Sequence, residues 1–273
     1  MSEFLDHPAF QGGIAPFFVA LIAAFALGRS RFVWLAIMPA YATMVALDTG
    51  FSLFPPTVAR KTWVIGLLAP LAGVAADRYR KSSRRITPAL VVATGLLSLW
   101  VFRTALEHRE GMAAVVAAGG IAAFVAAMVA LVLRLRDDGL RCGTAGMGLG
   151  IAAGIAGILS ASIGGLVAGV AIAMACAVML LVQSLLARTL APGFTGALPI
   201  GLIVALIAAG TQQLALLPWY ALPLMLLVPV AVSLPAPKPG PMFSRAAVLT
   251  ACALAAAALP IAAAWYAART SVS

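Results

Sequence analysis

The stretch GTAGMGLGIAAGIAGILSASIGGLVAG, residues 143 to 169, decides what kind of fold this chain adopts. Nine of its 27 residues are glycine. Inside it, the segment GLGIAA at residues 148–153 fits the G-x-G-x-x-A form of a dinucleotide-binding loop. Two interpretations compete: a soluble enzyme that binds a pyrophosphate, and a membrane protein whose glycines let helices pack closely.

The composition favours a membrane protein. The chain is 63% hydrophobic and 10% charged, whereas a soluble domain has about 25% charged residues. Its mean hydropathy is +1.08. A membrane-spanning helix needs about 20 apolar residues, and apolar runs of that kind fill most of the chain. We therefore expect one integral membrane domain over residues 1–273.

The glycine-rich stretch belongs to a long uncharged run from Thr144 to Ala187. As one helix, this run would extend about 66 Å, twice the roughly 30 Å hydrocarbon core. It must therefore turn back, and the segment SASIGG at residues 160–165 is the natural turn. A dinucleotide loop needs a preceding strand and an acidic residue about 20 positions later, and neither is present.

The glycines suit close packing of two membrane helices better. Their spacing gives two pairs of the small-x-x-x-small type, which allow two helix backbones to approach closely. The pairs are Gly150 with Gly154 and Gly165 with Gly169. A helix beside a translocation path is the alternative.

The apolar runs predict an all-α fold, a polytopic transmembrane bundle of about ten spans. The predicted helices cover residues 12–28, 32–50, 58–76, 86–106, 112–133, 144–160, 164–187, 196–217, 219–234 and 246–267.

Loop charge predicts that both termini lie outside. With that orientation, 13 of the 18 basic residues fall on the inner side, as the positive-inside rule requires. The inner residues are Arg29, Arg31, Arg78, Arg80, Lys81, Arg84, Arg85, Arg134, Arg136, Arg141, Arg188, Lys238 and Arg245. The outer ones are Arg60, Lys61, Arg103, Arg109 and Arg269.

The segment GVAADRYRK, residues 73–81, resembles the cytoplasmic-loop signature of the major facilitator superfamily. Gly73, Asp77, Arg78 and Lys81 match that pattern, and the resemblance implies an inner loop. Arg80 stands near the place of the signature's second glycine. That family has about twelve helices, and its loop follows the second helix. The alternative is a helix C-terminus flanked by basic membrane anchors.

Polar residues near the predicted outer ends of three helices suggest a solute path entered from outside. An ionisable residue in a membrane span is a functional candidate, and Arg103 would attract an anionic group. The alternatives are that Arg103 reaches to the lipid headgroups and that the amides bind neighbouring helices. The predicted path residues are Asp48, Arg103, Glu107, Gln212 and Gln213.

Four prolines lie five or six residues apart through the ninth predicted helix: Pro218, Pro223, Pro229 and Pro235. Proline removes a backbone donor and kinks a helix. Interrupted membrane helices often line transporter cavities, so these prolines predict a bent helix bordering the path. A bent helix used only for packing is the alternative.

No catalytic, cofactor or metal site is predicted, because the sequence shows no nucleophile with a His/Asp partner and no Cys/His cluster. Dispersed basic residues argue against nucleic acid, which needs a basic face. We therefore expect a non-enzymatic protein whose partners are the lipid bilayer, a small solute and other membrane proteins.

The chain resembles multi-pass inner-membrane proteins of proteobacteria without an assigned function. The segments HPAFQGGIAPF at residues 7–17 and RKTWV at residues 60–64 carry that resemblance, which implies a bacterial inner membrane and no particular activity. Two functions stay open: a small-solute permease, and a non-transporting scaffold or accessory subunit of a larger membrane complex.

Overall fold

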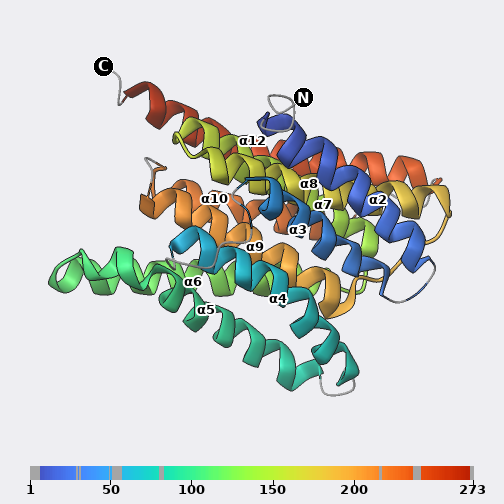
Figure 1. Cartoon of the computed structure of the whole chain (residues 1–273), viewed down its shortest axis with the longest axis horizontal. Helices are drawn as coiled ribbons and strands as arrows, with labels where there is room; N and C mark the ends of the chain where they lie inside the picture. Colours follow the sequence, from blue (N-terminus) through green and yellow to red (C-terminus); the bar gives the residue numbers. More distant parts are fainter. Residues whose placement is uncertain are drawn as a thin grey trace.

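The protein folds as a bundle of helices, seen in the computed structural model of the chain (Figure 1). The structure describes residues 7–28, 30, 32–48, 50, 57–79, 83–214, 217–235 and 241–270. All regular secondary structure in these ranges is helical. The predicted all-α class is therefore confirmed.

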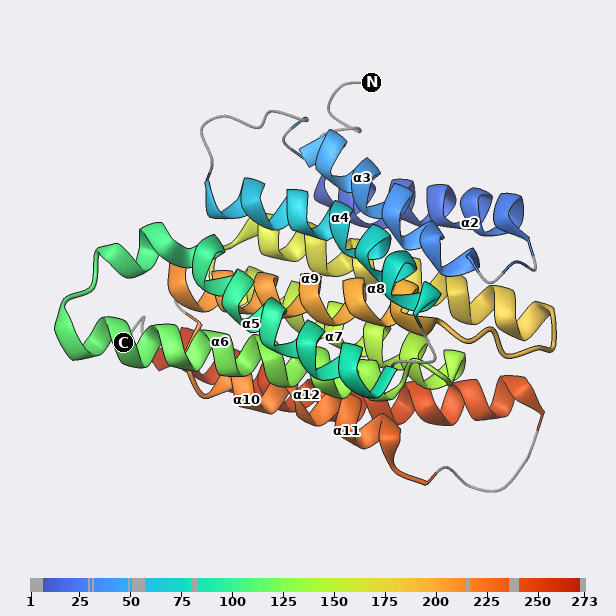
Figure 2. The ribbon, with the colours of Figure 1, turned by 90° about the horizontal axis from the view of Figure 1, so that it is seen from below.

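Most helices run roughly along the long axis of the molecule (Figure 2). They are η1 Phe10–Ile14, α2 Ala15–Leu27, η2 Val33–Ala36, α3 Ile37–Asp48, α4 Val58–Arg78, α5 Ser83–Glu107, α6 Gly111–Arg134, α7 Gly139–Leu159, α8 Ile163–Leu185, α9 Gly193–Leu214, α10 Ala221–Met225, α11 Leu227–Ser233 and α12 Met242–Thr270.

Within the described residues, eight helices are long and apolar enough to cross a membrane. The sequence predicted about ten. The two remaining apolar segments, Val33–Asp48 and Ala221–Ser233, are helical where predicted but have only 10 to 17 residues each. That is below the roughly 20 residues that span a bilayer. Length and composition therefore support eight spans and a helical membrane protein.

Proline breaks the second of these short segments, as the sequence predicted. The segment is divided at Leu226 into α10 and α11. Pro229 has no backbone N–H to donate to the carbonyl of Met225 four residues earlier, so one helical hydrogen bond is missing at the junction of α10 and α11.

Helix α9 forms the centre of the bundle. In its apolar window 89% of the residues are buried, against 72% in α7 and α8 and 22–33% in the other candidate spans. It packs against α4, α6, α7 and α8. A helix that is apolar all round belongs in a protein core or a membrane, so α9 is the core helix and the less buried helices form the outer layer of the bundle.

The glycine-rich stretch forms the end of α7, a tight turn and the start of α8. The turn at residues 160–162 lies where the sequence predicted it. A Cβ built on Gly169 would lie 2.5 Å from the backbone nitrogen of Gly154, and one on Gly150 would lie 2.6 Å from the carbonyl oxygen of Gly169. Around Gly154 and Gly165 the nearest atoms are at 3.3 and 3.0 Å. The two backbones therefore meet most closely at Gly169, which lies against Gly150 and Gly154 of α7.

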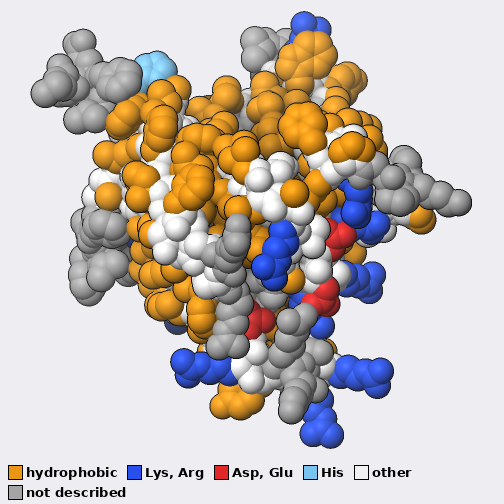
Figure 3. Space-filling model, turned by 90° about the vertical axis from the view of Figure 1, so that its right-hand side faces the viewer, with side chains coloured by type: hydrophobic (Ala, Val, Ile, Leu, Met, Phe, Trp, Pro, Cys, Tyr) orange, Lys and Arg blue, Asp and Glu red, His pale blue; other side chains and the backbone are white. Residues whose placement is uncertain are grey.

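Basic side chains gather at one end of the bundle, which we call the basic end (Figure 3). Helices α2, α4, α6, α8 and α11 finish there. Its described basic residues are Arg78, Arg84, Arg85, Arg134, Arg136, Arg141, Arg188 and Arg245. The other predicted inner residues, Arg29, Arg31, Arg80, Lys81 and Lys238, lie outside the described residues. We call the opposite end the distal end.

Candidate functional site

A cavity of about 460 Å³ opens between the distal ends of α3, α4, α8 and α9, and we call it the distal cavity. It extends along α9 from Leu214 to Leu206, a depth of about 12 Å at 1.5 Å per residue. Its polar and aromatic lining consists of Tyr41, Asp48, Thr57, Arg60, Thr62, Trp63, Ser162 and Thr211.

Local sequence explains why the cavity is open. Gly164, Gly165 and Gly210 contribute no side chains to its wall. Ser162 caps the N-terminus of α8, where its hydroxyl accepts a hydrogen bond from the Gly165 N–H at 3.3 Å. Thr57 caps α4 in the same way. The helix ends that meet here are therefore fixed by their own caps.

Tyr41 is the most unusual residue of the distal cavity. Its side chain is 1% exposed, yet its hydroxyl has no hydrogen-bond partner within the described part of the chain. A Cβ on Gly66 of α4 would overlap the Tyr41 ring, so this glycine makes room for the aromatic side chain. A buried polar group without a partner costs about 1–3 kcal/mol, which suggests that something else satisfies it.

Two other hydroxyl groups of the cavity already donate their hydrogens within their own helices, so only their oxygens remain available as acceptors. Thr62 donates its hydroxyl hydrogen to the Val58 carbonyl, and Thr211 donates to the Ile207 carbonyl, both at 2.9 Å. Each oxygen keeps lone pairs that can accept a hydrogen bond. The Asp48 carboxylate adds further acceptors. The cavity therefore offers several acceptors, and the Tyr41 hydroxyl is its fully buried polar group without a partner in the described residues.

A second hollow, which we call the apolar groove, lies between α6 and the α10–α11 segment at the distal half of the bundle. Its volume is about 780 Å³. Its lining consists of Arg109, Met112, Ala113, Val116, Ala117, Gly120, Ile121, Ala123, Phe124, Ala127, Gln212, Gln213, Trp219, Leu222, Pro223 and Leu226. It is much more apolar than the distal cavity.

The structure divides the five predicted path residues among three places. Asp48 lines the distal cavity, and Gln212 and Gln213 line the apolar groove. Arg103 and Glu107 form an ion pair with a nitrogen–oxygen distance of 2.6 Å, and their side chains are 73% and 55% exposed. This pair lines neither hollow.

Helix geometry explains part of that division. Successive residues of an α-helix point about 100° apart. Thr211 therefore faces the distal cavity, while Gln212 and Gln213 turn towards the apolar groove. Tyr41 was not among the residues predicted from the sequence, although a lone phenol inside an apolar run was a signal, since buried tyrosine hydroxyls usually find a partner.

At the basic end, Asp77 of α4 binds the N-terminus of α9. Its carboxylate accepts hydrogen bonds from the backbone N–H groups of Phe194 and Thr195 at 2.9 and 3.0 Å, and from the Thr195 hydroxyl at 2.6 Å. A Cβ on Gly73 would lie 2.5 Å from the Phe194 carbonyl oxygen. Gly73 and Asp77, both from the segment at residues 73–81, thus hold the N-terminus of α9 against α4.

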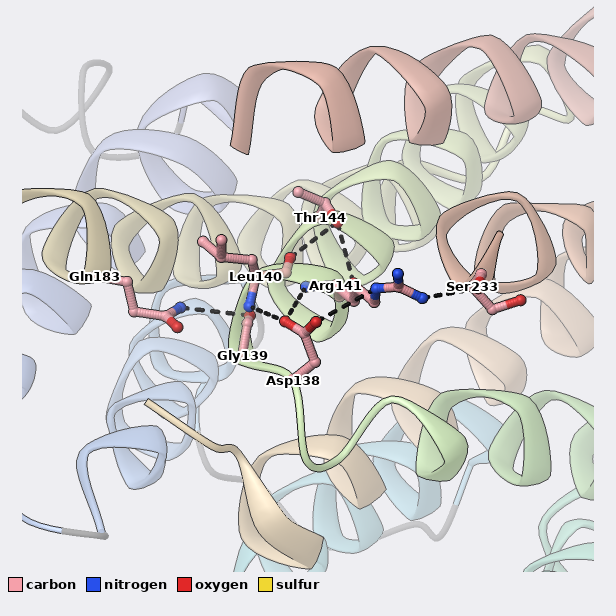
Figure 4. Close-up of polar contacts among 7 residues, drawn as sticks. All are labelled: Asp138, Gly139, Leu140, Arg141, Thr144, Gln183 and Ser233. Carbon is pink, nitrogen blue, oxygen red and sulfur yellow. Dashed lines mark hydrogen bonds and ion pairs between the residues drawn. The ribbon is translucent and has the colours of Figure 1, made fainter. Parts of the chain in front are cut away.

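A second polar network joins α7, α8 and α11 at the same end (Figure 4). Asp138 caps α7 by accepting from the N–H groups of Leu140 and Arg141. Arg141 donates to the Ser233 carbonyl at 2.7 Å. The buried Gln183 amide donates to the carbonyls of Met179 and Gly139. The basic end is therefore held together by hydrogen bonds, and its hollows, of about 170 and 200 Å³, are smaller than the distal cavity.

Comparisons of the chain with protein-family models, with curated proteins and with solved structures find no match. The fold and its cavities therefore define the class by themselves. Among the described residues, eight apolar helices, one of them the buried central helix α9, support a polytopic helical membrane protein. In the described residues, no three His, Cys, Asp or Glu side chains gather into a metal-binding group.

Proposed function

We propose that this protein is a small-solute permease of a bacterial inner membrane and that the distal cavity receives the solute from outside. The observation that carries the proposal is the buried Tyr41 hydroxyl, which has no hydrogen-bond partner among the described residues and lines, with Asp48, a cavity that enters the bundle. A solute that accepts from Tyr41 and donates to the cavity's acceptors would satisfy these groups.

The lining favours a small solute that carries an amine. Asp48 would pair with an ammonium group, and the rings of Tyr41 and Trp63 can attract a cation through their faces. Arg60 lines the same cavity and balances the charge of Asp48. The cavity as a whole therefore favours a solute without net charge, such as a small zwitterion.

Central helix α9 links the two ends of the proposed permease. Its distal end supplies Gly210 and Thr211 to the cavity, and its other end is held by Asp77. Release of solute to the inside requires the basic end to open. A shift of α9 that follows solute binding would act on the Asp77 contact directly.

The proposed orientation places the basic end inside, with ten crossings and both termini outside. In it, the short segments Val33–Asp48 and Ala221–Ser233 also cross. We expect reporters fused after Arg80, which lies outside the described residues, and after the C-terminus to report opposite sides of the membrane. Reporters on the same side would show that Ala221–Ser233, the short segment between the two fusion points, does not cross.

Cysteine labelling tests whether the distal cavity is hydrated. In a variant with Cys142, Cys176 and Cys252 replaced by alanine, we expect Ile207→Cys to react with a membrane-impermeant thiol reagent added outside. Ile207 lines the cavity and is 7% exposed. Ala205→Cys is the matched control, because Ala205 lies two residues away and is 0% exposed. Equal, negligible labelling at both positions would overturn the permease proposal.

The Ile207→Cys variant also serves to identify the solute. A panel of amino acids and small amines is screened for compounds that raise the unfolding temperature, and such a compound should protect Ile207→Cys from labelling. Tyr41→Phe should weaken its binding about 10-fold, because one hydrogen bond to the solute is lost. The alternative, an accessory subunit without transport, is favoured by the exposed apolar groove and predicts that no solute protects.

A further inference from the structure

The apolar groove has the dimensions of a site for one lipid chain. Its α6 wall runs from Met112 to Ala127, about 22 Å at 1.5 Å per residue. One leaflet of a bilayer core is about 15 Å thick, so the groove is long enough to hold an acyl chain over its whole depth. Met112, Val116 and Trp219 are exposed along it, so it opens towards the lipid.

Small residues and a broken helix create the groove. Ala113, Ala117 and Gly120 form a shallow strip on α6. A Cβ added at Gly120 would meet no atom within 4 Å. On the other side, the short helices α10 and α11 do not close over this strip. The space is thus built into the fold and is not filled by the chain's own described side chains.

Polar groups stand at the distal end of the groove, at the level expected for lipid headgroups. Arg109 precedes α6, and Gln212 and Gln213 end α9. The Gln213 amide donates to the side-chain oxygen of Gln212. Its own oxygen is buried and has no hydrogen-bond partner within the described residues. None of the residues that line the groove is Asp or Glu, so its charge is positive.

We propose that the apolar groove is a specific binding site for an anionic phospholipid. One acyl chain lies along the α6 strip between Gly120 and the α10–α11 segment. The phosphate lies against Arg109, whose guanidinium matches phosphate geometry. A headgroup hydroxyl donates to the free oxygen of Gln213. Phosphatidylglycerol carries all three features, a chain, a phosphate charge and hydroxyl donors, and is the lipid used in the test.

Native mass spectrometry of the protein from mixed vesicles of phosphatidylglycerol and phosphatidylcholine tests this site. We expect one phosphatidylglycerol molecule to remain on the wild-type protein. Gly120→Leu should lower its occupancy at least 5-fold, because the leucine fills the groove. Gly119→Leu is the matched control: a Cβ there also meets no atom within 4 Å, but Gly119 does not line the groove.

The contribution of the Arg109 charge is tested separately from that of the groove's volume. Arg109→Gln should bring the preference for phosphatidylglycerol over phosphatidylcholine close to 1 while a bound lipid remains. Equal phosphatidylglycerol occupancy in the two glycine variants, or an unchanged preference in Arg109→Gln, would overturn the proposal. A dimer mass that Gly120→Leu abolishes would also overturn it, since the groove would then hold a second copy of the chain. None of these outcomes depends on solute transport.

Discussion

Replacing Gly169 by leucine is expected to destabilise the protein by about 3 kcal/mol or more, at the upper end of overpacking effects. A Cβ at this position would lie 2.5 Å from the Gly154 nitrogen and 2.7 Å from the Gly150 carbonyl oxygen. Both are backbone atoms of α7, which cannot move aside as a side chain can. The two helices would have to separate along their most extensive contact.

Gly164 provides the matched control, since it lies five residues earlier on the same helix and a Cβ there meets no atom within 4 Å. Both substitutions gain helix propensity of up to about 1 kcal/mol, so the difference between them isolates the steric cost. We expect Gly164→Leu to unfold in detergent at or near the wild-type temperature. The alanine pair, Gly169→Ala and Gly164→Ala, should show the same order with a smaller gap. Equal unfolding temperatures in both pairs would show that α7 and α8 are not tightly apposed.

Replacing Asp77 by alanine is expected to cost about 3 kcal/mol, because the N-terminus of α9 then loses all three hydrogen bonds to the carboxylate. The N–H groups of Phe194 and Thr195 would lack that acceptor. The negative charge that now faces the positive end of the α9 dipole would also be lost. Thermal unfolding in detergent measures the effect.

Graded variants separate these contributions. Asp77→Asn keeps an acceptor oxygen but not the charge, and it should fall between the wild type and Asp77→Ala. Thr195→Val removes only the hydroxyl contact and should cost about 1 kcal/mol. Glu107→Ala is the control, since it removes an exposed acid from an ion pair worth under about 1 kcal/mol. If Asp77→Ala were as stable as Glu107→Ala, the carboxylate would not hold α9 in place.

The helical content of this chain follows from local sequence. Uncharged runs of about 20 residues can satisfy their backbone groups in a membrane only as helices. The length of the run from Thr144 to Ala187 requires the turn that the structure places at residues 160–162. The closely spaced prolines of residues 218–235 likewise predict the break between α10 and α11. These features depend on residues within a few turns of one another.

Composition did not reveal how many of these helices are long enough to span. The predicted spans at residues 32–50 and 219–234 include the short segments Val33–Asp48 and Ala221–Ser233. Apolar residues continue beyond both helices, and hydropathy alone does not show where helical hydrogen bonding ends. The count of eight among the described residues therefore came from the structure.

Only tertiary structure decided which polar residues meet. Asp77 binds an amide 117 positions away, and no local pattern predicts that partner. Tyr41 and Thr211 face one cavity, whereas Gln212, the next residue along the chain, turns to the apolar groove. A predicted path through Asp48, Arg103 and the glutamines assumed that outer helix ends converge. The sequence determined that these residues lie on helices and near which ends. Helix packing determined the direction each one faces, because rotation of a helix about its axis depends on its neighbours.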